Sequence, residues 1–439
     1  MIKQKRFLLS LIILVTLIGT ATTQNVGIDS PYGRYGYGVL SKPALGATES
    51  MGGISYGIRR GTNVNPGNPA SYSASDTLNF TMEMGVSGQY SKLSDGIDNQ
   101  SFQNGNFDYL AFQFPVYKNI GMSVGLLPYS KVGYDFGRDV RREDIPYRET
   151  FNGSGGLSQV YGGVAYAPVE WLSLGANVSY LFGSIKHSRD LSRIGTGEAS
   201  NQLENTSFSI KNAMFDFGAQ FTYPINERKS MTLGVVYTPR VKNKATVTNT
   251  NYLYSATDTQ LLPSDTLKNT SFDLPQTLGV GLSYTSVNWL VGIDGTFQQW
   301  NKVKFPDELD NMTLNTRFND KFSVGLGAEY VADPVNRNFF KRVRLRGGLS
   351  YSNSYTNMNV SDPDTNLSLG EHGYKEYGVN VGFGLPFRDM ISGRISMINL
   401  GFGYSIMDPE HKYMIKEEMF KVSVNININE FWFFKRQFD

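Results

Sequence analysis

The sequence predicts an all-β protein: a transmembrane antiparallel β-barrel of 14 strands with an N-terminal hatch, or plug, inside the lumen. Three observations support this prediction. Glycine and aromatic residues are abundant, whereas charged residues make up only 18% of the chain. Apolar residues alternate with small polar ones in segments of about ten residues, and the connections between these segments alternate between short and long.

Composition also excludes several classes of function. The chain has 41 Lys and Arg against 39 Asp and Glu, a net charge of +2, so no nucleic-acid partner is expected. It has no cysteine and three histidines, none of which has a Ser, Asp or second His beside it on a predicted strand face. We therefore expect no metal site, no cofactor and no enzymatic activity.

The first 23 residues have the order of a secretory signal peptide. A basic stretch ending at Arg6 precedes the apolar stretch Phe7 to Gly19, and the small residues Ala21 to Thr23 follow. A membrane anchor is the alternative, but roughly 13 apolar residues are too few to span a bilayer as a helix. We expect cleavage near Gln24 and export to the bacterial outer membrane.

Residues 24–76 are glycine-rich and lack sustained alternation, so they are not expected to form barrel wall. Two placements are open: a disordered periplasmic tail, or a hatch folded up into the lumen. The segment holds many apolar and aromatic residues, more than a solvated tail would carry. We therefore favour the hatch.

Residues 77–439 are predicted to form the barrel wall. In Val422 to Asn429 the even positions are apolar and the odd positions are Ser or Asn. A soluble sandwich could alternate as well, but its outer face would carry Lys and Glu, whereas a crowded lumen favours Gly, Ser, Thr and Asn. The fourteen segments begin near Leu78, Leu110, Met122, Val160, Leu172, Phe215, Met231, Leu278, Trp289, Phe322, Val343, Tyr377, Ile395 and Val422.

The connections set the orientation of the wall. Those after even-numbered segments, such as 118–120, are mostly short, and those after odd-numbered segments run to roughly 10 to 27 polar residues. Both ends of the wall should therefore lie on the periplasmic side, with long polar loops outside. A mixed charge run at 138–149 falls in the second such loop, where we expect it to be solvated or to contact lipopolysaccharide.

Six ionisable residues lie between apolar neighbours in the alternation and so should face the lumen. Charges at membrane depth need partners. They could line a polar path for cargo, or they could form a network that joins the hatch to the wall through Arg59 and Arg60. We favour the network, because buried charges must be paired whatever the cargo is. The six residues are Glu83, Asp216, Asp294, Glu329, Arg344 and Arg346.

The third segment contains a proline in an apolar-facing position. Pro128 has no amide hydrogen and cannot complete a strand ladder, and Gly121 and Gly125 loosen the same segment. Two interpretations are open. Pro128 could end the membrane strand as the chain enters its loop, or it could mark a break in the wall.

Three groups of residues carry a resemblance to a known family. They are Ala44-Leu45-Gly46-Ala47 with Gly52-Gly53 and Asn68-Pro69-Ala70; Leu274 to Gly279 with Tyr284, Trp289, Asp294 and Trp300; and Val324 to Tyr330 with Arg346 to Tyr351. Their order and spacing resemble the FadL-type long-chain fatty-acid transporter family across nearly the whole mature chain.

Membership would imply a 14-stranded barrel blocked by a hatch, with Asn68, Pro69 and Ala70 at its gate. Hydrophobic ligands would enter from outside and leave sideways through a window at the third strand. The chain departs from the family pattern in its polar loops after the third and fifth strands, where apolar ligand anchors would be expected.

Three functions are therefore considered. The first is passive transport of hydrophobic or amphipathic, fatty-acid-like small molecules, with hatch gating and lateral release. The second is a porin for polar solutes, against which a hatch of this length argues. The third is a non-transporting barrel that serves as a structural subunit or shuttle in an outer-membrane protein complex. The expected partners are outer-membrane lipid and lipopolysaccharide, a hydrophobic small-molecule ligand and, in the third case, proteins of that complex.

Overall fold

The computed structural model describes residues 27, 30–76, 78–96, 98–142, 145–194, 201–255, 258–305, 308–309, 312–313, 316–362, 367–388 and 393–431. The predicted signal peptide lies outside the described residues. No helix among those described is long and apolar enough to cross a membrane.

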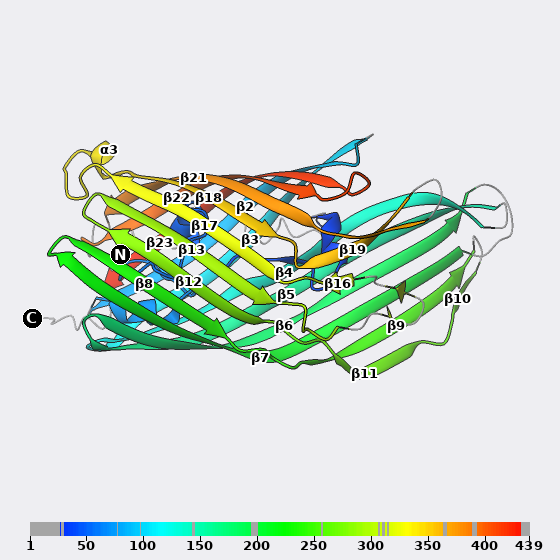
Figure 1. Ribbon diagram of the computed structural model, residues 1–439, viewed down its shortest axis with the longest axis horizontal. Helices are drawn as coiled ribbons and strands as arrows, with labels where there is room; N and C mark the ends of the chain where they lie inside the picture. The colour runs from blue at the N-terminus through cyan, green and yellow to red at the C-terminus, as the bar shows by residue number, and fades with distance from the viewer. Residues whose placement is uncertain are drawn as a thin grey trace, which may run out of the picture.

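Fourteen antiparallel strands form a closed barrel, as predicted (Figure 1). Each strand pairs with its neighbour along the wall, and the first and last strands close the barrel from Asn79↔Phe431 to Ser94↔Lys416. Each predicted segment corresponds to one wall strand. The wall strands are β2 (Asn79–Ser94), β3 (Asn99–Tyr117), β4 (Ile120–Arg142), β5 (Ile145–Val169), β6 (Leu172–Arg193), β7 (Asn201–Asn226), β8 (Lys229–Thr238), β12 (Gln276–Thr285), β13 (Trp289–Gln299), β17 (Lys321–Val331), β18 (Arg344–Asn353), β21 (Tyr374–Arg388), β22 (Ile395–Pro409) and β23 (Lys416–Phe431).

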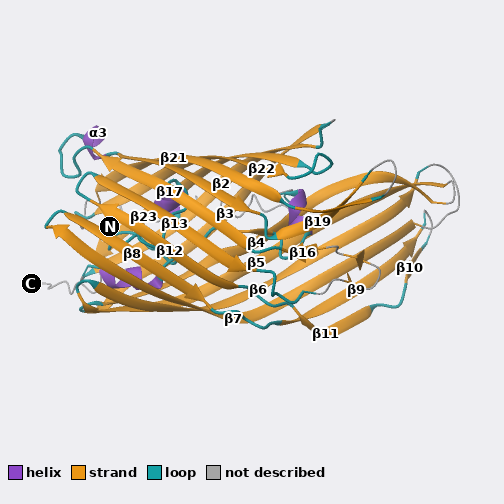
Figure 2. Ribbon diagram, in the orientation of Figure 1, coloured by secondary structure: helices purple, strands orange, loops and turns teal. Residues whose placement is uncertain are grey.

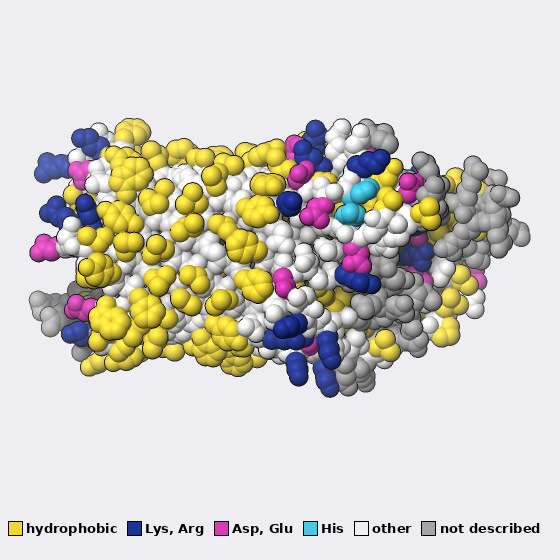
Figure 3. Space-filling model, in the orientation of Figure 1, with side chains coloured by type: hydrophobic (Ala, Val, Ile, Leu, Met, Phe, Trp, Pro, Cys, Tyr) yellow, Lys and Arg dark blue, Asp and Glu magenta, His cyan; other side chains and the backbone are white. Residues whose placement is uncertain are grey.

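The alternation in the sequence becomes two faces of the wall. In β23, Asn425, Asn427 and Asn429 are buried in the lumen, whereas Val424 on the other face is 38% exposed. The same division in the other strands builds an apolar outer belt, which Figure 3 shows as a broad hydrophobic band with charged side chains gathered beyond its two ends. This belt is the surface that a bilayer requires of a barrel.

The two ends of the barrel differ. At one end, called the turn end below, short connections such as 118–119, 170–171 and 227–228 join the strands. At the other, the extended end, β4 to β7 continue far beyond the apolar belt, with lengths of 23, 25, 22 and 26 residues, against 10 for β8 (Figure 2). β9 (Lys244–Tyr254), β10 (Thr259–Leu261) and β11 (Asp265–Ser271) add to this extension.

The prediction of long polar loops is therefore wrong for much of this end. The charge run at 138–149 lies mostly in the β4–β5 hairpin, where Arg138 Nε donates to Glu149 Oε2 at 2.8 Å. Beyond the apolar belt a strand needs no apolar outer face, so the ladder continues although the apolar alternation by which a strand is recognised in the sequence stops. Cross-strand pairs of polar side chains stabilise the sheet in this part of the barrel.

The interior of the extended end is filled by aromatic side chains. Trp300 is fully buried among Tyr37, Phe318 and Tyr355, and the Tyr37 hydroxyl donates to the Asp273 carbonyl at 2.9 Å. Short strands lie in this region: β14 (Glu308–Leu309), β15 (Met312–Thr313), β16 (Thr316–Phe318), β19 (Thr356–Ser361) and β20 (Ser368–His372).

Candidate functional site in the barrel lumen

The N-terminal segment, residues 30–76, lies inside the barrel (Figure 1). It contains η1 (Pro31–Arg34), β1 (Val39–Leu40), α2 (Gly46–Glu49) and η2 (Pro69–Ala74). Wall glycines let its backbone touch the strands: a methyl group added to Gly348 would lie 2.1 Å from Gly52 N, and one added to Gly327 would lie 2.1 Å from Met51 O. Only glycine permits so close an approach.

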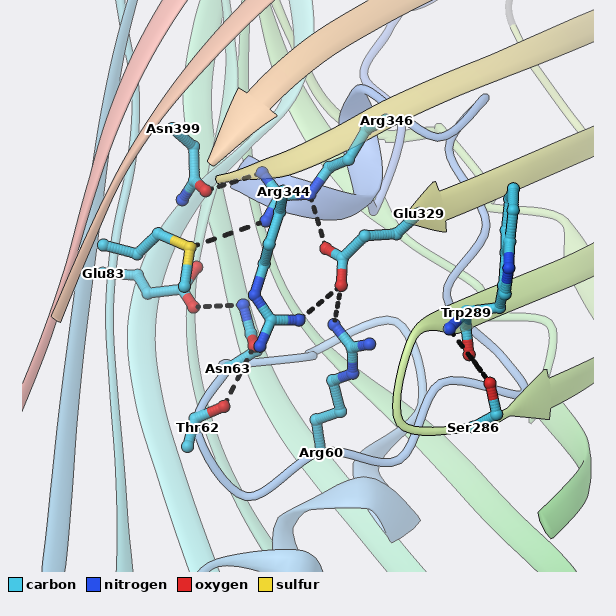
Figure 4. A network of polar contacts seen from close by, with 11 residues as sticks. Arg60, Thr62, Asn63, Glu83, Ser286, Trp289, Glu329, Arg344, Arg346 and Asn399 are labelled. Atoms are coloured by element: carbon cyan, nitrogen blue, oxygen red, sulfur yellow. Dashed lines mark hydrogen bonds and ion pairs between the residues drawn. The ribbon is translucent and has the colours of Figure 1, made fainter. Parts of the chain in front are cut away.

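One buried carboxylate joins this segment to the wall. Glu329 of β17 accepts from Arg60 of the segment at 2.7 Å, and from Arg344 and Arg346 of β18 at 2.5 and 2.7 Å (Figure 4). Arg346 Nη1 also donates to Asn399 Oδ1 at 2.7 Å. Three cations thus surround one anion, and the predicted residues Glu329, Arg344 and Arg346 come together around Arg60.

Two other predicted carboxylates hold the backbone of the segment. Asp294 Oδ2 accepts from the amides of Ser55 at 2.5 Å and Tyr56 at 2.8 Å. Glu83 Oε1 accepts from the Val64 amide at 3.0 Å. Both side chains are almost fully buried. Charge-assisted bonds of this kind are the strong ones, so these groups fasten the segment to β13 and β2.

Asp216 lies apart from that arrangement. Its Oδ1 accepts from Thr238 Oγ1 of the neighbouring strand β8 at 2.6 Å. The six predicted charges therefore do not form one continuous path. They are distributed over an ion cluster, two backbone-binding carboxylates and a bond between two wall strands.

Asn68, Pro69 and Ala70 begin η2 at a fully buried position. Asn68 Nδ2 donates to Tyr56 O at 2.8 Å, and its Oδ1 accepts from the Ala70 amide at 3.1 Å, which caps the helical turn. The wall opposite is glycine again: a methyl group on Gly218 would lie 2.2 Å from Asn68 Oδ1. This motif thus packs against β6 and β7, and β4 meets η2 farther along, at Tyr72.

Arg59 supports the same turn from within the segment. Its Nη1 donates to Ala70 O at 3.1 Å and to Gln220 Oε1 of β7 at 3.4 Å. Burial lowers the pKa of Arg59. Of the two arginines expected to tie the segment to the wall, Arg60 forms an ion pair and Arg59 forms hydrogen bonds to neutral oxygens.

Little space remains where the segment meets the wall near the ion cluster. A cavity there measures only about 10 Å³, which is the lower limit for one water molecule. Its lining includes Leu45, Met51, Ile58, Leu290 and Glu329. Any solute passing this point would have to displace the segment.

The wall is open along one seam, between β3 and β4. These strands pair only as far as Leu110↔Leu126; beyond that level β4 continues to Arg142 paired with β5, and β3 continues its ladder with β2. β1 occupies the edge of β4 that β3 leaves, with the register Val39↔Lys131 and Leu40↔Ser130. We call this unpaired seam the β3/β4 opening; β1 lies along it.

The predicted residues of the third segment lie at or below this opening. Pro128 lies after Leu127, just beyond the last residue of β4 that pairs with β3, Leu126. The register shift at Pro128 falls instead in the ladder with β5, between Pro128 and Ser130. Gly121 gives room for η2, since a methyl group there would lie 1.9 Å from Tyr72 O. Sequence reasoning missed β1, whose only signal is an apolar dipeptide after Gly36 and Gly38, both of which have positive φ.

A family model described as BamG matches residues 1–439. No curated protein matches the chain. The fold is similar to that of the toluene transporter TodX of P. putida, at 15% identity and a TM-score of 0.59, over 90% of this chain and 100% of that one. It is similar to CymD, a monoaromatic hydrocarbon channel, at 15% identity and 0.57, over 90% and 99%. A Pseudomonas aeruginosa FadL homologue aligns at 14% identity and 0.56, over 89% and 99%.

Proposed function

The chain belongs to the BamG family, and we propose that it is a passive outer-membrane transporter for hydrophobic or amphipathic, fatty-acid-like small molecules. The observation that carries this proposal is the β3/β4 opening, where the wall is unpaired and a strand of the N-terminal segment takes the free edge. The likeness in fold to a toluene transporter and a hydrocarbon channel agrees with it.

We place the barrel in the bacterial outer membrane, delivered by a cleaved signal peptide. The extended end faces outward and the turn end faces the periplasm, because outer-membrane barrels have short periplasmic turns and long structures outside. The apolar belt matches this placement, as does the pairing of the first and last strands at the turn end, Asn79 with Phe431.

Residues 24–76 act as the hatch in this proposal, with Asn68, Pro69 and Ala70 at its gate. The gate packs against β6 and β7 while the segment is fastened through Arg60, Asp294 and Glu83. These attachments hold the lower part of the segment in place. The part that must move to clear a route is β1, which rests on β4 through two register pairs.

Lateral release would use the gap that β1 covers. Where the gap begins, the outward side chains are apolar: Leu126 of β4, at the last pair with β3, is 36% exposed, and Phe107 of β3, beyond that pair, is 46% exposed. A hydrophobic ligand leaving between β3 and β4 would pass directly from the lumen to lipid without crossing water. This favours hydrophobic cargo over the polar solutes of a porin.

A crosslink that locks the cover tests this route. The chain has no cysteine, so Leu40→Cys with Ser130→Cys would join the register partners of β1 and β4 with a single disulfide. Uptake of a labelled long-chain fatty acid or toluene into cells should fall when the disulfide is formed and return on reduction. A matched crosslink between the wall partners Val291 and Ala328 should leave uptake unchanged. Full uptake with the first crosslink formed would refute lateral release.

A second candidate function is a non-transporting barrel in an outer-membrane protein complex. Two observations favour it: the cavity beside the ion cluster measures only about 10 Å³, and a packed aromatic core lies in the extended end. Gentle purification followed by identification of bound proteins and lipids separates the two candidates. A stoichiometric protein partner favours the complex, and a bound fatty acid favours transport.

A further inference from the structure

The connection between β17 and β18 differs from its neighbours at the turn end. It spans residues 332–343 and contains the short helix α3 (Phe339–Arg342), whereas the connections 118–119, 170–171, 227–228 and 286–288 have two or three residues and 389–394 has six. A barrel needs only a tight turn to join two strands here. Joining β17 to β18 therefore does not by itself explain why this connection is so long. We call residues 332–343 the α3 turn.

The α3 turn is held in one conformation by its own polar groups. The Asp333 carboxylate accepts from the Val335 amide at 3.1 Å and from Asn336 Nδ2 at 2.9 Å. Asn338 Oδ1 accepts from the Phe340 amide at 3.0 Å, which caps α3, and the Asp333 amide donates to Lys341 O at 2.9 Å. Its side chains are thus presented in a fixed arrangement.

That arrangement exposes two phenylalanines beside three cations. Phe340 is 82% exposed and Phe339 is 41% exposed, with their rings edge to face at 5.7 Å. Arg337, Lys341 and Arg342 flank them in the sequence; the first two are exposed and Arg342 is half-buried. Within the described part of the chain none of the three forms an ion pair. Exposed large apolar groups next to basic ones are typical of segments that lie in a membrane interface.

The position of the α3 turn matches that interface. It begins two residues after Tyr330, whose ring packs on Trp289 at 4.6 Å; both point outward, where such rings mark the headgroup level. β21 runs past its last pair with β18, Gly384↔Arg344, as far as Arg388, and α3 lies close to β21. Figure 1 shows α3 at the rim of the barrel. The exposed phenylalanines therefore continue the lipid-facing belt.

We propose that the α3 turn is a binding site for anionic phospholipids in the leaflet at the turn end. Phe339 and Phe340 insert among the upper acyl chains, and Arg337, Lys341 and Arg342 contact the phosphate groups. Basic residues near an anionic surface each add to the attraction, and two aromatic rings anchor the contact in depth. The inference rests on the proposed membrane placement but not on transport.

A single label measures the insertion. The mature protein carrying Phe340→Cys, labelled with a polarity-sensitive fluorophore, is reconstituted into vesicles of phosphatidylcholine with or without phosphatidylglycerol. We expect blue-shifted emission that is quenched by lipids with brominated chains, with a larger shift when phosphatidylglycerol is present. The control carries the label on Glu227→Cys, in the exposed β7–β8 turn, and should report water in both vesicles.

The charge contribution is tested by Arg337→Gln, Lys341→Gln and Arg342→Gln together in the labelled protein. This variant should lose the phosphatidylglycerol-dependent part of the shift while keeping the heat-resistant barrel mobility on gels. An emission maximum typical of water in both vesicles would overturn insertion and would favour a periplasmic protein as the partner of the α3 turn. Equal shifts in both vesicles would overturn the assignment to anionic lipid. Because these substitutions leave the β3/β4 opening intact, failure here is distinct from failure of the crosslinking experiment.

Discussion

The N-terminal segment meets the wall in two very different ways. At β17 and β18 the wall is a continuous ladder, and the segment is held by a buried cluster in which Arg60, Arg344 and Arg346 surround Glu329. At the β3/β4 opening the wall is unpaired. The segment is held there by the two register pairs of β1 with β4 and by backbone bonds from Ser30 N to Gly133 O at 3.0 Å and from Ser41 N to Tyr129 O at 2.9 Å. The attachment at β17 and β18 consists of buried ion pairs, and the attachment at β4 consists of backbone hydrogen bonds.

The difference indicates which part of the segment can move. Removing one partner of a buried ion pair costs about 3–5 kcal/mol, because the remaining charges stay buried and uncompensated. A backbone hydrogen bond contributes a net of about 1 kcal/mol, since water can replace it. Each backbone bond between β1 and β4 should therefore break at a smaller free-energy cost than the pair of Arg60 with Glu329, so we expect any opening of the segment to begin at β1.

The largest expected effect comes from removing both attachments at once. Deleting residues 32–66 should leave a folded barrel that conducts ions, because the wall closes through β2 and β23 without the segment. Conductance in planar bilayers measures the outcome. If the deleted protein is folded yet conducts no better than the intact one, the segment does not block the lumen.

Breaking the anchor alone should mainly reduce stability. Glu329→Ala leaves three cations without their shared carboxylate, and we expect the free energy of unfolding to fall by about 3–5 kcal/mol. Denaturant unfolding in detergent measures the change. Glu371→Ala, which breaks the exposed pair with Arg317, is the matched control and should cost less than about 1 kcal/mol. Equal losses in the two variants would show that the anchor is no stronger than a surface pair.

Breaking the cover should produce a local opening instead. Gly38 has φ +85°, and a methyl group there would lie 2.3 Å from Lys131 O, so Gly38→Ala should push β1 off β4. Hydrogen exchange of the amides from Val39 to Ser41 should become faster. Gly53→Ala is the control, because its φ is +82° but the nearest atoms lie 3.9 Å away. It carries the backbone strain of about 1–2 kcal/mol without the clash. Equal acceleration in both variants would assign the effect to strain alone.

The smallest effect is expected at Pro128. Its register shift lies in the β4–β5 ladder, whereas the opening lies on the other edge of β4, so Pro128→Ala should change stability by less than about 1 kcal/mol and leave the opening in place. Hydrogen exchange of residues 99–107 in β3 is the measurement. New protection of these amides would mean that the proline itself keeps β3 and β4 apart.

The alternation in the sequence determined the number of wall strands, their order and the face of each residue. This information is local: in a strand, successive side chains point to opposite sides, so a run such as Val422 to Asn429 identifies its lumen face without any partner. The same rule assigned Glu83, Asp294 and Glu329 to the interior. It could not determine what they meet there, because nothing in a two-residue period records the fold of the N-terminal segment.

Only the tertiary structure decided the partners and the ends of the strands. That Glu329 pairs with Arg60 while Asp294 binds the backbone of Ser55 and Tyr56 depends on contacts between residues more than 200 positions apart in sequence. The strand extensions were not predicted because beyond the apolar belt no apolar face is required, and backbone pairing alone leaves no pattern in the composition. Likewise, Pro128 indicated an irregularity in β4 but not which of the two ladders of β4 it interrupts. That depends on how β3 and β5 run beside β4 and on β1 pairing with the edge that β3 leaves.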